Sequence, residues 1–523
     1  MPASLELAPI IHAARAGALQ RAWRLLREAG LEGADQPAAL AVQGRLLKDE
    51  ARAAPEGEAR RAFYVRSAAA YLRAHVLSGE LYPLINAASL SLLAGQADAA
   101  RELAEQALAA PPDPDETAYF QAATPAEALL VLGRVEEARR ALAGAVARAP
   151  QAWADHASTI RQFELLLGAL GEDAAWLDAL RPPRPLSFAG HMAVAPDDRR
   201  LAEQVAQALE ANRIGFGYGA LAAGADIVIA EALLARGAEL HLVLPGSAAA
   251  FRAASVAHFG AAWADRFDRV MDAATSVRVL AGAAAPDHRL ALQLGGEAAM
   301  GLAVMQAETL ASRPTQLVVL EDAGAAGGEP GSSAWSRSAW MAAGRAAPLV
   351  IEAPRDPAAP APPAAAERED VRLAAMLTAI VAPMPAETLA GEVLPRLHAL
   401  AGAEGAPAVA NWSEDRLFLA FDTPGQAAAA ARRLTEALGE AVRVGGHYGV
   451  ALAARDPFAG GPLLLGEAAA LSGRLAGAAL PGGAQVSEAF AAALHAHGPA
   501  RTEPVGELEG QPADRPLPVF ALR

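Results

Sequence analysis

The strongest constraint on the fold is a run of prolines, Arg181-Pro182-Pro183-Arg184-Pro185, that separates two kinds of sequence pattern. Proline cannot continue a helix, and it biases the residue before it toward extended backbone. Residues 1–180 carry almost no strand signal and many strong helix formers. From Leu186 onward, short apolar runs alternate with helical segments. The sequence therefore predicts a helical region at 1–180, followed by an α/β region with a parallel sheet at 186–353.

A Gly-x4-Ala element recurs within the helical region. Its glycines lie about 40 residues apart, which is the length of one helix–turn–helix unit. Small residues at these places would let paired helices approach closely, so the spacing predicts a helical repeat. The element occurs at Gly17/Ala22, Gly57/Ala62, Gly95/Ala100 and Gly133/Ala138.

Two of the repeat units resemble tetratricopeptide repeats. The first of these units begins at Leu92-Leu93-Ala94-Gly95, and the second begins with the similar segment Val131-Leu132-Gly133. Each unit ends at a proline. Two further segments, Tyr82–Ala88 and Asp155–Thr159, resemble the helical TRAF-binding region of apoptosis signal-regulating kinases and its bacterial relatives. The resemblance implies that a protein partner binds the helical region. A generic helical solenoid with no particular partner is the alternative.

Charge and composition narrow the classes of partner. Lys and Arg number 44 against 59 Asp and Glu, and the net charge of -15 repels a phosphate backbone. No basic patch stands out, so no nucleic-acid partner is predicted. No uninterrupted stretch of ~18 strongly apolar residues occurs, so no membrane span is expected. The lack of cysteine and of a signal-like start at Met1–Glu6 makes the cytoplasm the expected location.

A glycine-rich segment, Gly215–Asp226, is predicted to form a ligand-binding turn in the α/β region. It opens a helix that runs to about Arg236 and precedes a strand. Glycines let the backbone approach a ligand, and free N–H groups at a helix start favour an anion. Tight packing of the helix on the sheet is the alternative explanation for the glycines. The candidate cofactor-binding residues in this segment are Gly217, Gly219, Gly224 and Asp226.

The whole segment resembles the nucleotide-binding fold shared by the DNA-processing protein family and the cytokinin-activating LOG enzymes. The resemblance covers 186–353 and implies a Rossmann-like sheet that binds a nucleotide-like ligand. Gly190 and His191 would end the first strand, where ligands of open α/β sheets bind, so they are candidates too. A structural role for His191 is the alternative. LOG enzymes carry a second phosphate loop, and here only Gly295-Gly296-Glu297 approximates it, out of context, so phosphoribohydrolase activity is not expected.

The C-terminal part follows a Pro/Ala-rich linker predicted at 354–369, and its α+β pattern runs to Arg523. The segment Val442–Val450 resembles the Arg-hydrophobic-Gly-x-His-x-Gly strand of class III adenylate/guanylate cyclases. The resemblance covers 370–523 and implies a ferredoxin-like domain. Further elements follow in cyclase order: Asp456-Pro457, Gly466, Arg474, Pro481-Gly482-Gly483 and Val486-Ser487-Glu488.

The cyclase resemblance implies a catalytic set of two aspartates, an asparagine and an arginine. Cyclisation of a nucleoside triphosphate requires two metal ions between the aspartates, and the Asn and Arg donate to the transition state. Aligned to the family, the first aspartate is replaced by Ala379 and the asparagine by Ala470, whereas Asp415 and Arg474 are retained. Glu414 stands where the family has a glycine. No catalytic site and no metal site are therefore predicted, and Asp415 is the candidate ligand for Mg²⁺ or Mn²⁺ if the domain is active. Replacement of the lost carboxylate by the neighbouring Glu414 is the alternative that stays open.

These features predict a signalling scaffold. Helical repeats would bind a protein partner, the α/β region would sense a nucleotide-like small molecule, and an impaired cyclase-like domain would form a homodimer, because the family builds its sites across a two-fold interface. Two alternatives stay open. One is an active adenylate or guanylate cyclase regulated by the upstream regions, and the other is a small-molecule hydrolase acting through the α/β region.

Overall fold

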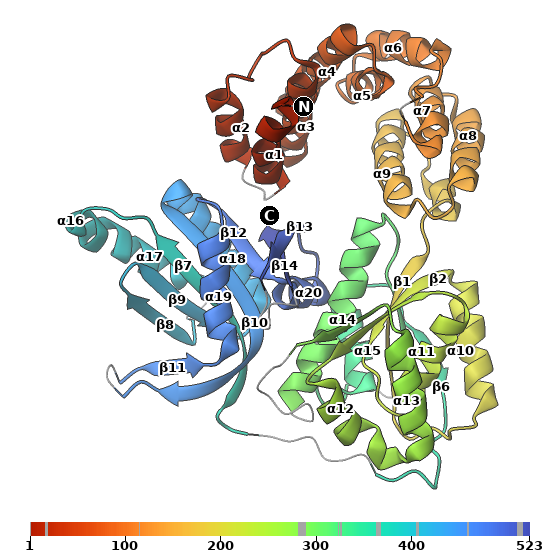
Figure 1. Ribbon diagram of the computed structural model, residues 1–523, viewed down its shortest axis with the longest axis vertical. Helices are drawn as coiled ribbons and strands as arrows, with labels where there is room; N and C mark the ends of the chain where they lie inside the picture. The colour runs from red at the N-terminus through yellow and green to blue at the C-terminus, as the bar shows by residue number, and fades with distance from the viewer. Residues whose placement is uncertain are drawn as a thin grey trace. The chain divides into compact units, whose positions relative to one another are not determined.

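The chain forms two compact units in a computed structural model (Figure 1). The first unit comprises Met1–Pro182 with Thr309–Ser312, and the second comprises Pro183–Glu308 and Arg313–Arg523. The structure describes residues 2–15, 19–114, 116–280, 289–322, 324, 327–361, 368–403, 407–457, 460–509 and 516–523. Gly17 of the predicted repeat and residues 362–367 of the predicted linker lie outside the described residues.

The first unit is helical, as the sequence predicts. Gly95 and Gly133 each form the turn between two paired helices, at φ of 81° and 73°. A Cβ at either glycine would meet nothing within 4 Å, so these turns require glycine for its left-handed backbone and not for close packing. The helices are α1 (Pro2–Arg15), α2 (Leu19–Glu28), α3 (Pro37–Ala53), α4 (Glu58–Ser78), α5 (Leu81–Leu93), α6 (Ala97–Ala109), α7 (Ala118–Val131), α8 (Val135–Arg148) and α9 (Trp153–Leu170), with a 3-10 turn at Ala175–Ala179.

The alanines of the repeat element make the close packing instead. Ala100 and Ala138 are buried at 1% and 0% exposure between neighbouring helices. The instance at Gly57 differs, because Gly57 is the N-cap of α4 and Ala62 is exposed. The expectation that both small residues allow close approach is therefore wrong for the three described glycines, Gly57, Gly95 and Gly133. It holds for three of the four alanines, because Ala22 is also buried, at 0% exposure.

The second unit begins with a 6-stranded parallel sheet of order β4-β3-β2-β1-β5-β6. Helices flank it on both faces, which explains why β5 is buried at every residue. The order reverses between β1 and β5, and such a reversal opens a crevice at the carboxyl ends of the strands. The elements are β1 (Arg184–Gly190), α10 (Arg199–Ala211), β2 (Ile214–Gly219), α11 (Ala225–Ala235), β3 (Glu239–Leu244), α12 (Ala248–Ser255), α13 (Ala261–Ala273), β4 (Ser276–Val279), α14 (Arg289–Thr309), β5 (Thr315–Leu320), α15 (Ser333–Ala342) and β6 (Leu349–Glu352), with a 3-10 turn at Ala257–Phe259.

An 8-stranded sheet completes the unit, in the order β13-β14-β12-β10-β7-β9-β8 with β11 paired to β10. Its long strand β10 pairs antiparallel with β7 from Val442 opposite Val381 to Leu452 opposite Val371. The elements are β7 (Val371–Val381), α16 (Ala386–Thr388), a π-helical turn (Leu389–Val393), α17 (Leu394–Ala401), β8 (Val409–Ser413), β9 (Arg416–Phe421), α18 (Pro424–Leu438), a 3-10 turn (Gly439–Ala441), β10 (Val442–Arg455), β11 (Pro462–Leu465), α19 (Glu467–Ala478), β12 (Ala484–Ser487), α20 (Glu488–His497), β13 (Thr502–Leu508) and β14 (Leu517–Leu522).

The cyclase-like motif occupies the buried middle of β10. A Cβ on Gly445 would lie 2.1 Å from the backbone nitrogen of Ala476 and 2.2 Å from the carbonyl oxygen of Ser472, so α19 lies directly on the strand. Nδ1 of the buried His447 lies 2.7 Å from the Ser487 hydroxyl, and burial lowers the pKa of His447 to about 4. Packing against α19 and α20 thus explains the glycine and histidine of this motif.

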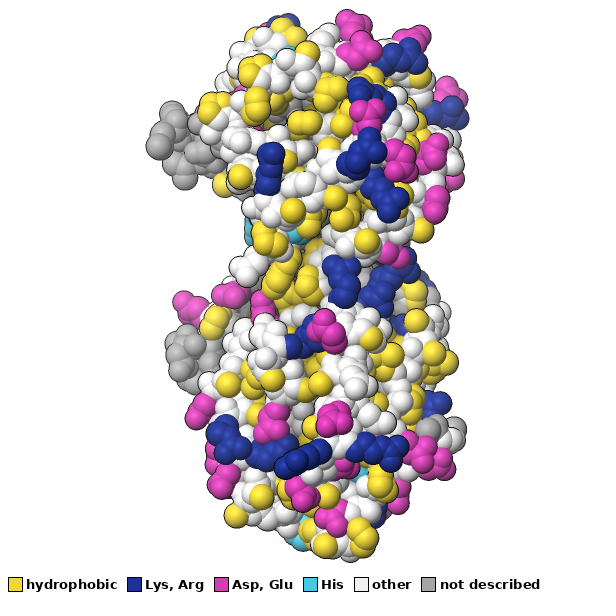
Figure 2. Space-filling model, turned by 90° about the vertical axis from the view of Figure 1, so that its right-hand side faces the viewer, with side chains coloured by type: hydrophobic (Ala, Val, Ile, Leu, Met, Phe, Trp, Pro, Cys, Tyr) yellow, Lys and Arg dark blue, Asp and Glu magenta, His cyan; other side chains and the backbone are white. Residues whose placement is uncertain are grey.

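The surface shown in Figure 2 mixes acidic and basic side chains. Exposed ion pairs among the described residues include Arg134 with Glu137 and Arg252 with Asp268. Pairs of this exposed kind contribute little to stability. Within the part of the chain that the structure describes, no helix is long and apolar enough to cross a membrane.

Gly445→Ala should destabilise the second unit by about 1–3 kcal/mol or more, because the methyl group would overlap the backbone of α19. Gly477→Ala is the matched control on α19, where a Cβ meets nothing within 4 Å, and it should stabilise by about 0.5–1 kcal/mol. Thermal unfolding followed by circular dichroism measures both. Equal unfolding temperatures for the two variants would show that the contact is not tight.

Candidate functional site

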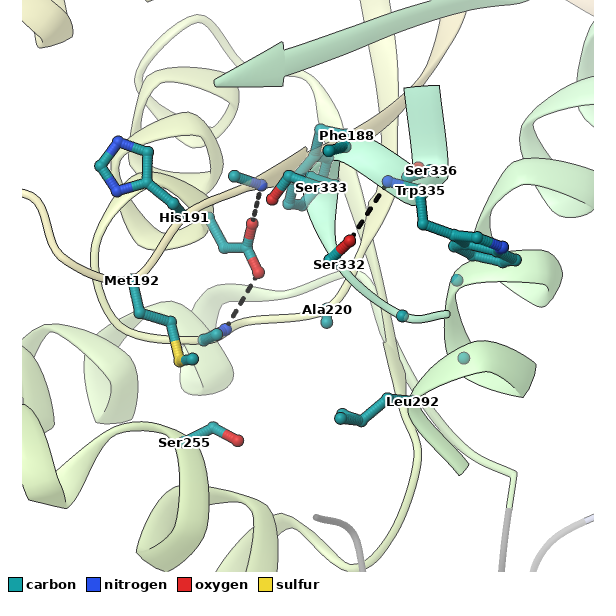
Figure 3. A pocket seen from close by; sticks show the side chains of 18 of the residues that line it. Phe188, His191, Met192, Ala220, Ser255, Leu292, Ser332, Ser333, Trp335 and Ser336 are labelled. Atoms are coloured by element: carbon teal, nitrogen blue, oxygen red, sulfur yellow. Dashed lines mark hydrogen bonds between the residues drawn. The ribbon is translucent and has the colours of Figure 1, made fainter. Parts of the chain in front are cut away.

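A cavity of about 500 Å³ lies at the carboxyl ends of β1 and β5, where the strand order reverses (Figure 3). Its volume is in the range of small-molecule sites, ~300–1,000 Å³. The end of β1 and the segment after it form one wall, and α14 and the start of α15 form another. Residues that line it include Phe188, Gly190, His191, Met192, Ala222, Asp226, Phe251, Ser255, Leu292, Gly295, Gly296, Glu321, Asp322, Ser332, Ser333, Trp335 and Arg355.

Most of the lining is apolar, and its polar groups are concentrated at a few points. Phe251, Leu292 and Trp335 contribute large apolar surfaces. Arg355 is the one Lys or Arg among the lining residues, and its Nε lies 3.4 Å from Oε2 of Glu321. An apolar cleft with a few well-placed polar groups is the usual form of a small-molecule binding site.

The carboxylate of Asp226 holds the glycine-rich loop against the end of β1. Oδ1 accepts a hydrogen bond from the backbone N–H of Gly190 at 2.8 Å, and Oδ2 accepts one from the N–H of Ala222 at 3.2 Å. Burial raises the pKa of Asp226 to about 7, although both hydrogen bonds act to lower it. Asp226 therefore fixes the shape of one wall and changes its charge near neutral pH.

The predicted glycines fall into two groups. Gly190 lines the cavity, and a Cβ there would lie 2.3 Å from the Cβ of Ala225. Gly217 and Gly219 instead make room for Leu233 and the ring of Phe188, at 2.3 Å and 2.5 Å from the position of a Cβ. Gly224 has a φ of 84°, and a Cβ there would lie 2.5 Å from the carbonyl oxygen of Met192. These last three glycines are outside the lining, and their role in binding stays a prediction.

His191 lies across the cavity from Trp335 (Figure 3). Its Nε2 is 3.0 Å from the carbonyl oxygen of Ala353, and this geometry assigns the proton to Nε2. Its Nδ1 is buried and has no hydrogen-bond partner among the described residues. Burial lowers the pKa of His191, so the ring is neutral at pH 7 and Nδ1 is an acceptor.

Sequence reasoning missed the start of α15. Gly331, Ser332 and Ser333 lead into this helix beside the cavity, and the Ser332 hydroxyl accepts a hydrogen bond from the N–H of Trp335 at 3.2 Å. A signal was present, because the glycine- and serine-rich stretch from Gly327 to Ser333 lies between a buried strand and a helix. Gly295-Gly296-Glu297 instead lies within α14, so it is not a phosphate loop.

The four positions aligned to the cyclase catalytic set lie on strand β7, in the turn between β8 and β9, and on helix α19. Ala379 is buried in β7, opposite Val444 of β10 and Leu417 of β9. Asp415 is exposed in the turn between β8 and β9, beside Glu414, whose φ of 56° is the left-handed conformation that a glycine adopts without strain. Ala470 and Arg474 are exposed, one turn apart, on α19.

Two arginines surround the retained aspartate and helix. Nε of Arg416 lies 3.5 Å from Oδ1 of Asp415. Nη1 of the same arginine lies 4.0 Å from where a Cβ on Gly473 of α19 would be, so its guanidinium spans from the hairpin to the helix. Arg474 donates to the carbonyl oxygen of Glu509. The described residues contain no group of three or more His, Asp or Glu that could hold a metal ion.

One family model matches the chain, that of the Tetratricopeptide Repeats-Sensor family, over residues 6–91. The N-terminal region thus contains tetratricopeptide-like sensor repeats. The match spans α1 to most of α5. It ends before the glycines of the two repeat segments, Gly95 and Gly133, that resemble tetratricopeptide repeats in the sequence. A search of curated proteins returned no match.

Solved structures similar to part of the chain include nucleotidyl cyclase domains. They include the adenylyl cyclase CyaB from P. aeruginosa, at 14% identity and a TM-score of 0.25, covering 29% of this chain and 94% of that one. An adenylate/guanylate cyclase/hydrolase from Silicibacter pomeroyi has 20% identity and a TM-score of 0.23, with coverages of 29% and 96%. The guanylate cyclase domain of RhGC from Catenaria anguillulae, in complex with GTP, has 13% identity and a TM-score of 0.25, with the same coverages of 29% and 96%.

Asp226 should make the stability of the second unit depend on pH. Its ordinary pKa is 3.8 and its pKa in the folded protein is about 7, so the unfolded chain releases the proton first as the pH rises. The contribution of Asp226 to stability should fall between about pH 4 and pH 7, by on the order of 4 kcal/mol, and not change further above pH 7.

Asp226→Asn should remove this contribution. Denaturant unfolding at pH 4.5 and pH 8 measures it as the difference between wild type and variant, with the exposed Asp322→Asn as the control. We expect the wild type to become more stable relative to the Asp226→Asn variant as the pH is lowered. A difference that is the same at both pH values would show that Asp226 titrates normally.

Proposed function

We propose that the protein is a signalling scaffold with a sensor cavity. The helical region binds a protein partner, the first sheet of the second unit binds a nucleotide-like small molecule, and the second sheet is a cyclase-like domain with impaired catalysis that forms a homodimer. The observation that carries the proposal is the cavity at the strand-order reversal, combined with the lack of a carboxylate at position 379.

The position of the cavity supports ligand sensing. Open parallel sheets bind ligands where the strand order reverses, and the cavity lies there. The starts of α11 and α15 both border it, and N–H groups at a helix start favour an anionic group such as a phosphate. The ring of Trp335 and the apolar side chains beside it fit a base. A nucleotide supplies both kinds of group, in agreement with the resemblance to the DNA-processing and LOG proteins.

The chemistry that a cyclase needs supports the proposal of impaired catalysis. Two metal ions require carboxylates on two strands, and Ala379 offers only a methyl group on β7. Asp415 has the guanidinium of Arg416 at 3.5 Å, a cation that competes with a metal ion for this carboxylate. Loss of one transition-state donor, as at Ala470, costs ~10²–10³ in rate, and loss of a metal ligand multiplies that to ~10⁴ or more.

Exposed apolar side chains support the two proposed association surfaces. Leu452 of β10 and Leu465 of β11 face each other across the pair of strands and are 37% and 44% exposed, so a homodimer could bury them. In the helical unit, Val76, Leu77 and Tyr82 are exposed around the turn from α4 to α5, and this supports the turn as the proposed surface for a protein partner.

The rival function is an active cyclase, which the retained Asp415 and Arg474 favour. Purified protein incubated with ATP or GTP and either Mn²⁺ or Mg²⁺ should yield no cyclic nucleotide above a blank without protein. Asp415→Ala is the diagnostic variant, and the exposed Asp422→Ala is its control. Cyclic product that disappears in Asp415→Ala and persists in Asp422→Ala would establish the rival function.

Ligand sensing predicts that a nucleotide raises the unfolding temperature of the second unit. A panel of ATP, GTP, their monophosphates and their cyclic monophosphates should contain at least one stabilising ligand, because binding at 100 times Kd adds about 2.7 kcal/mol. Gly295→Leu, which places a side chain in the cavity, should abolish the shift. Gly144→Leu on α8, where a Cβ meets nothing within 4 Å, should not. A panel without a stabilising nucleotide would contradict the sensing role.

A further inference from the structure

Helix α14 lines the cavity with one face and packs against the second sheet with the other. One of its faces lines the cavity, through Leu292, Gly295, Gly296 and Ala299. These residues are spaced three and four apart, so they share one side of the helix. The opposite side carries Leu294, Glu297, Gly301 and Met305, and these residues face the second sheet and its helices. The wall of the cavity is therefore also a wall of the cyclase-like domain.

The contact between α14 and α20 is made by backbone. A Cβ on Gly301 would lie 1.7 Å from the carbonyl oxygen of Ala492, so no side chain separates the two helices at their crossing. α14 and α20 accordingly lie side by side in Figure 1. Because neither backbone can be compressed, a shift of α14 toward α20 must displace α20 as well.

Polar contacts join the same two helices on either side of the crossing. The buried Glu297 of α14 lies 3.4 Å from Nε2 of His497, and this contact raises the pKa of His497. Near the C-terminal end of α14, Oε2 of Glu308 lies 3.2 Å from Nδ1 of His495. Both histidines lie at the end of α20, so this end is tied to α14 twice.

Helix α20 in turn packs on the strand that carries the cyclase-like motif. The ring of Phe490 lies 3.3 Å from where a Cβ on Gly446 would be, and Ser487, the N-cap of α20, has its hydroxyl 2.7 Å from Nδ1 of His447. Tyr448 of β10 is buried near Glu297, and burial together with the charge of Glu297 raises its pKa. The route from cavity to motif thus runs through two helices in direct contact.

We infer that α14 transmits occupancy of the cavity to α20 and to the Gly446–Gly449 segment of β10. The inference rests on the proposed sensing function and specifies how that site acts on the rest of the protein. A ligand that fills the cavity presses on the face formed by Gly295 and Gly296, where there is no side chain to absorb the displacement. The opposite face passes the movement on through Gly301 and Glu297.

Hydrogen exchange measured by mass spectrometry on the full chain tests the inference without any ligand. Gly295→Leu serves as a built-in occupant, since a Cβ there has its first neighbours at 3.7 Å, in ordinary contact with Pro245. We expect exchange to quicken by about fivefold or more in Glu488–His497 and at Gly446–Gly449, the lower bound of ordinary coupling between sites. Gly144→Leu is the control and should leave both segments unchanged.

Two outcomes decide the matter. Faster exchange confined to the cavity-lining segments, with α20 and β10 as in the wild type, would overturn the inference while leaving the sensing role intact. Failure of every nucleotide to bind would remove the sensing role and leave this measurement valid as a test of mechanical coupling. If Gly295→Leu gives too little folded protein, Ala299→Leu places the same bulk one turn along the same face.

Discussion

The second unit depends on places where one backbone lies against another with no side chain between them. Gly301 puts α14 on α20, and Gly445 puts β10 on α19. Such contacts have no rotamers with which to absorb a displacement, so they fix distances more firmly than packed leucines do. These contacts fix the positions of the first sheet, the helices and the second sheet relative to one another within the second unit. Any account of what the cavity does must include the elements that cannot move independently of it.

The sequence predicts the architecture well where local patterns decide it. Helix formers and the proline run at Arg181–Pro185 locate the end of the helical unit, and alternation of apolar runs with helices predicts the parallel sheet. What the sequence could not predict is that the two sheets share one compact unit. Helix α14 makes that association, but its buried residues look like those of any core helix. A helix that packs against one sheet and a helix that packs against two have the same apolar sequence pattern.

The candidate site was predictable in part. Gly190 and His191 could be predicted because open parallel sheets bind ligands at the carboxyl ends of their strands. Both residues line the cavity. Gly217 and Gly219 could not be distinguished from binding glycines, because a glycine that makes room for Leu233 or Phe188 looks the same in sequence. The contribution of Arg416 was also hidden, since its contact with Asp415 and its reach to α19 depend on the hairpin that places it.

Two kinds of buried titrating group in the second unit pull in opposite directions. Burial lowers the pKa values of His447 and His241 to about 4. In mild acid these histidines are therefore protonated in the unfolded chain but not in the folded protein, and acid favours unfolding. Asp226, with a pKa of about 7, does the reverse across the same interval. The two opposing pH dependences partly cancel. The free energy of unfolding of the second unit should therefore change less between about pH 4 and pH 7 than either kind of group alone would make it change. Replacing only the aspartate would expose the acid sensitivity of the imidazoles that it now offsets.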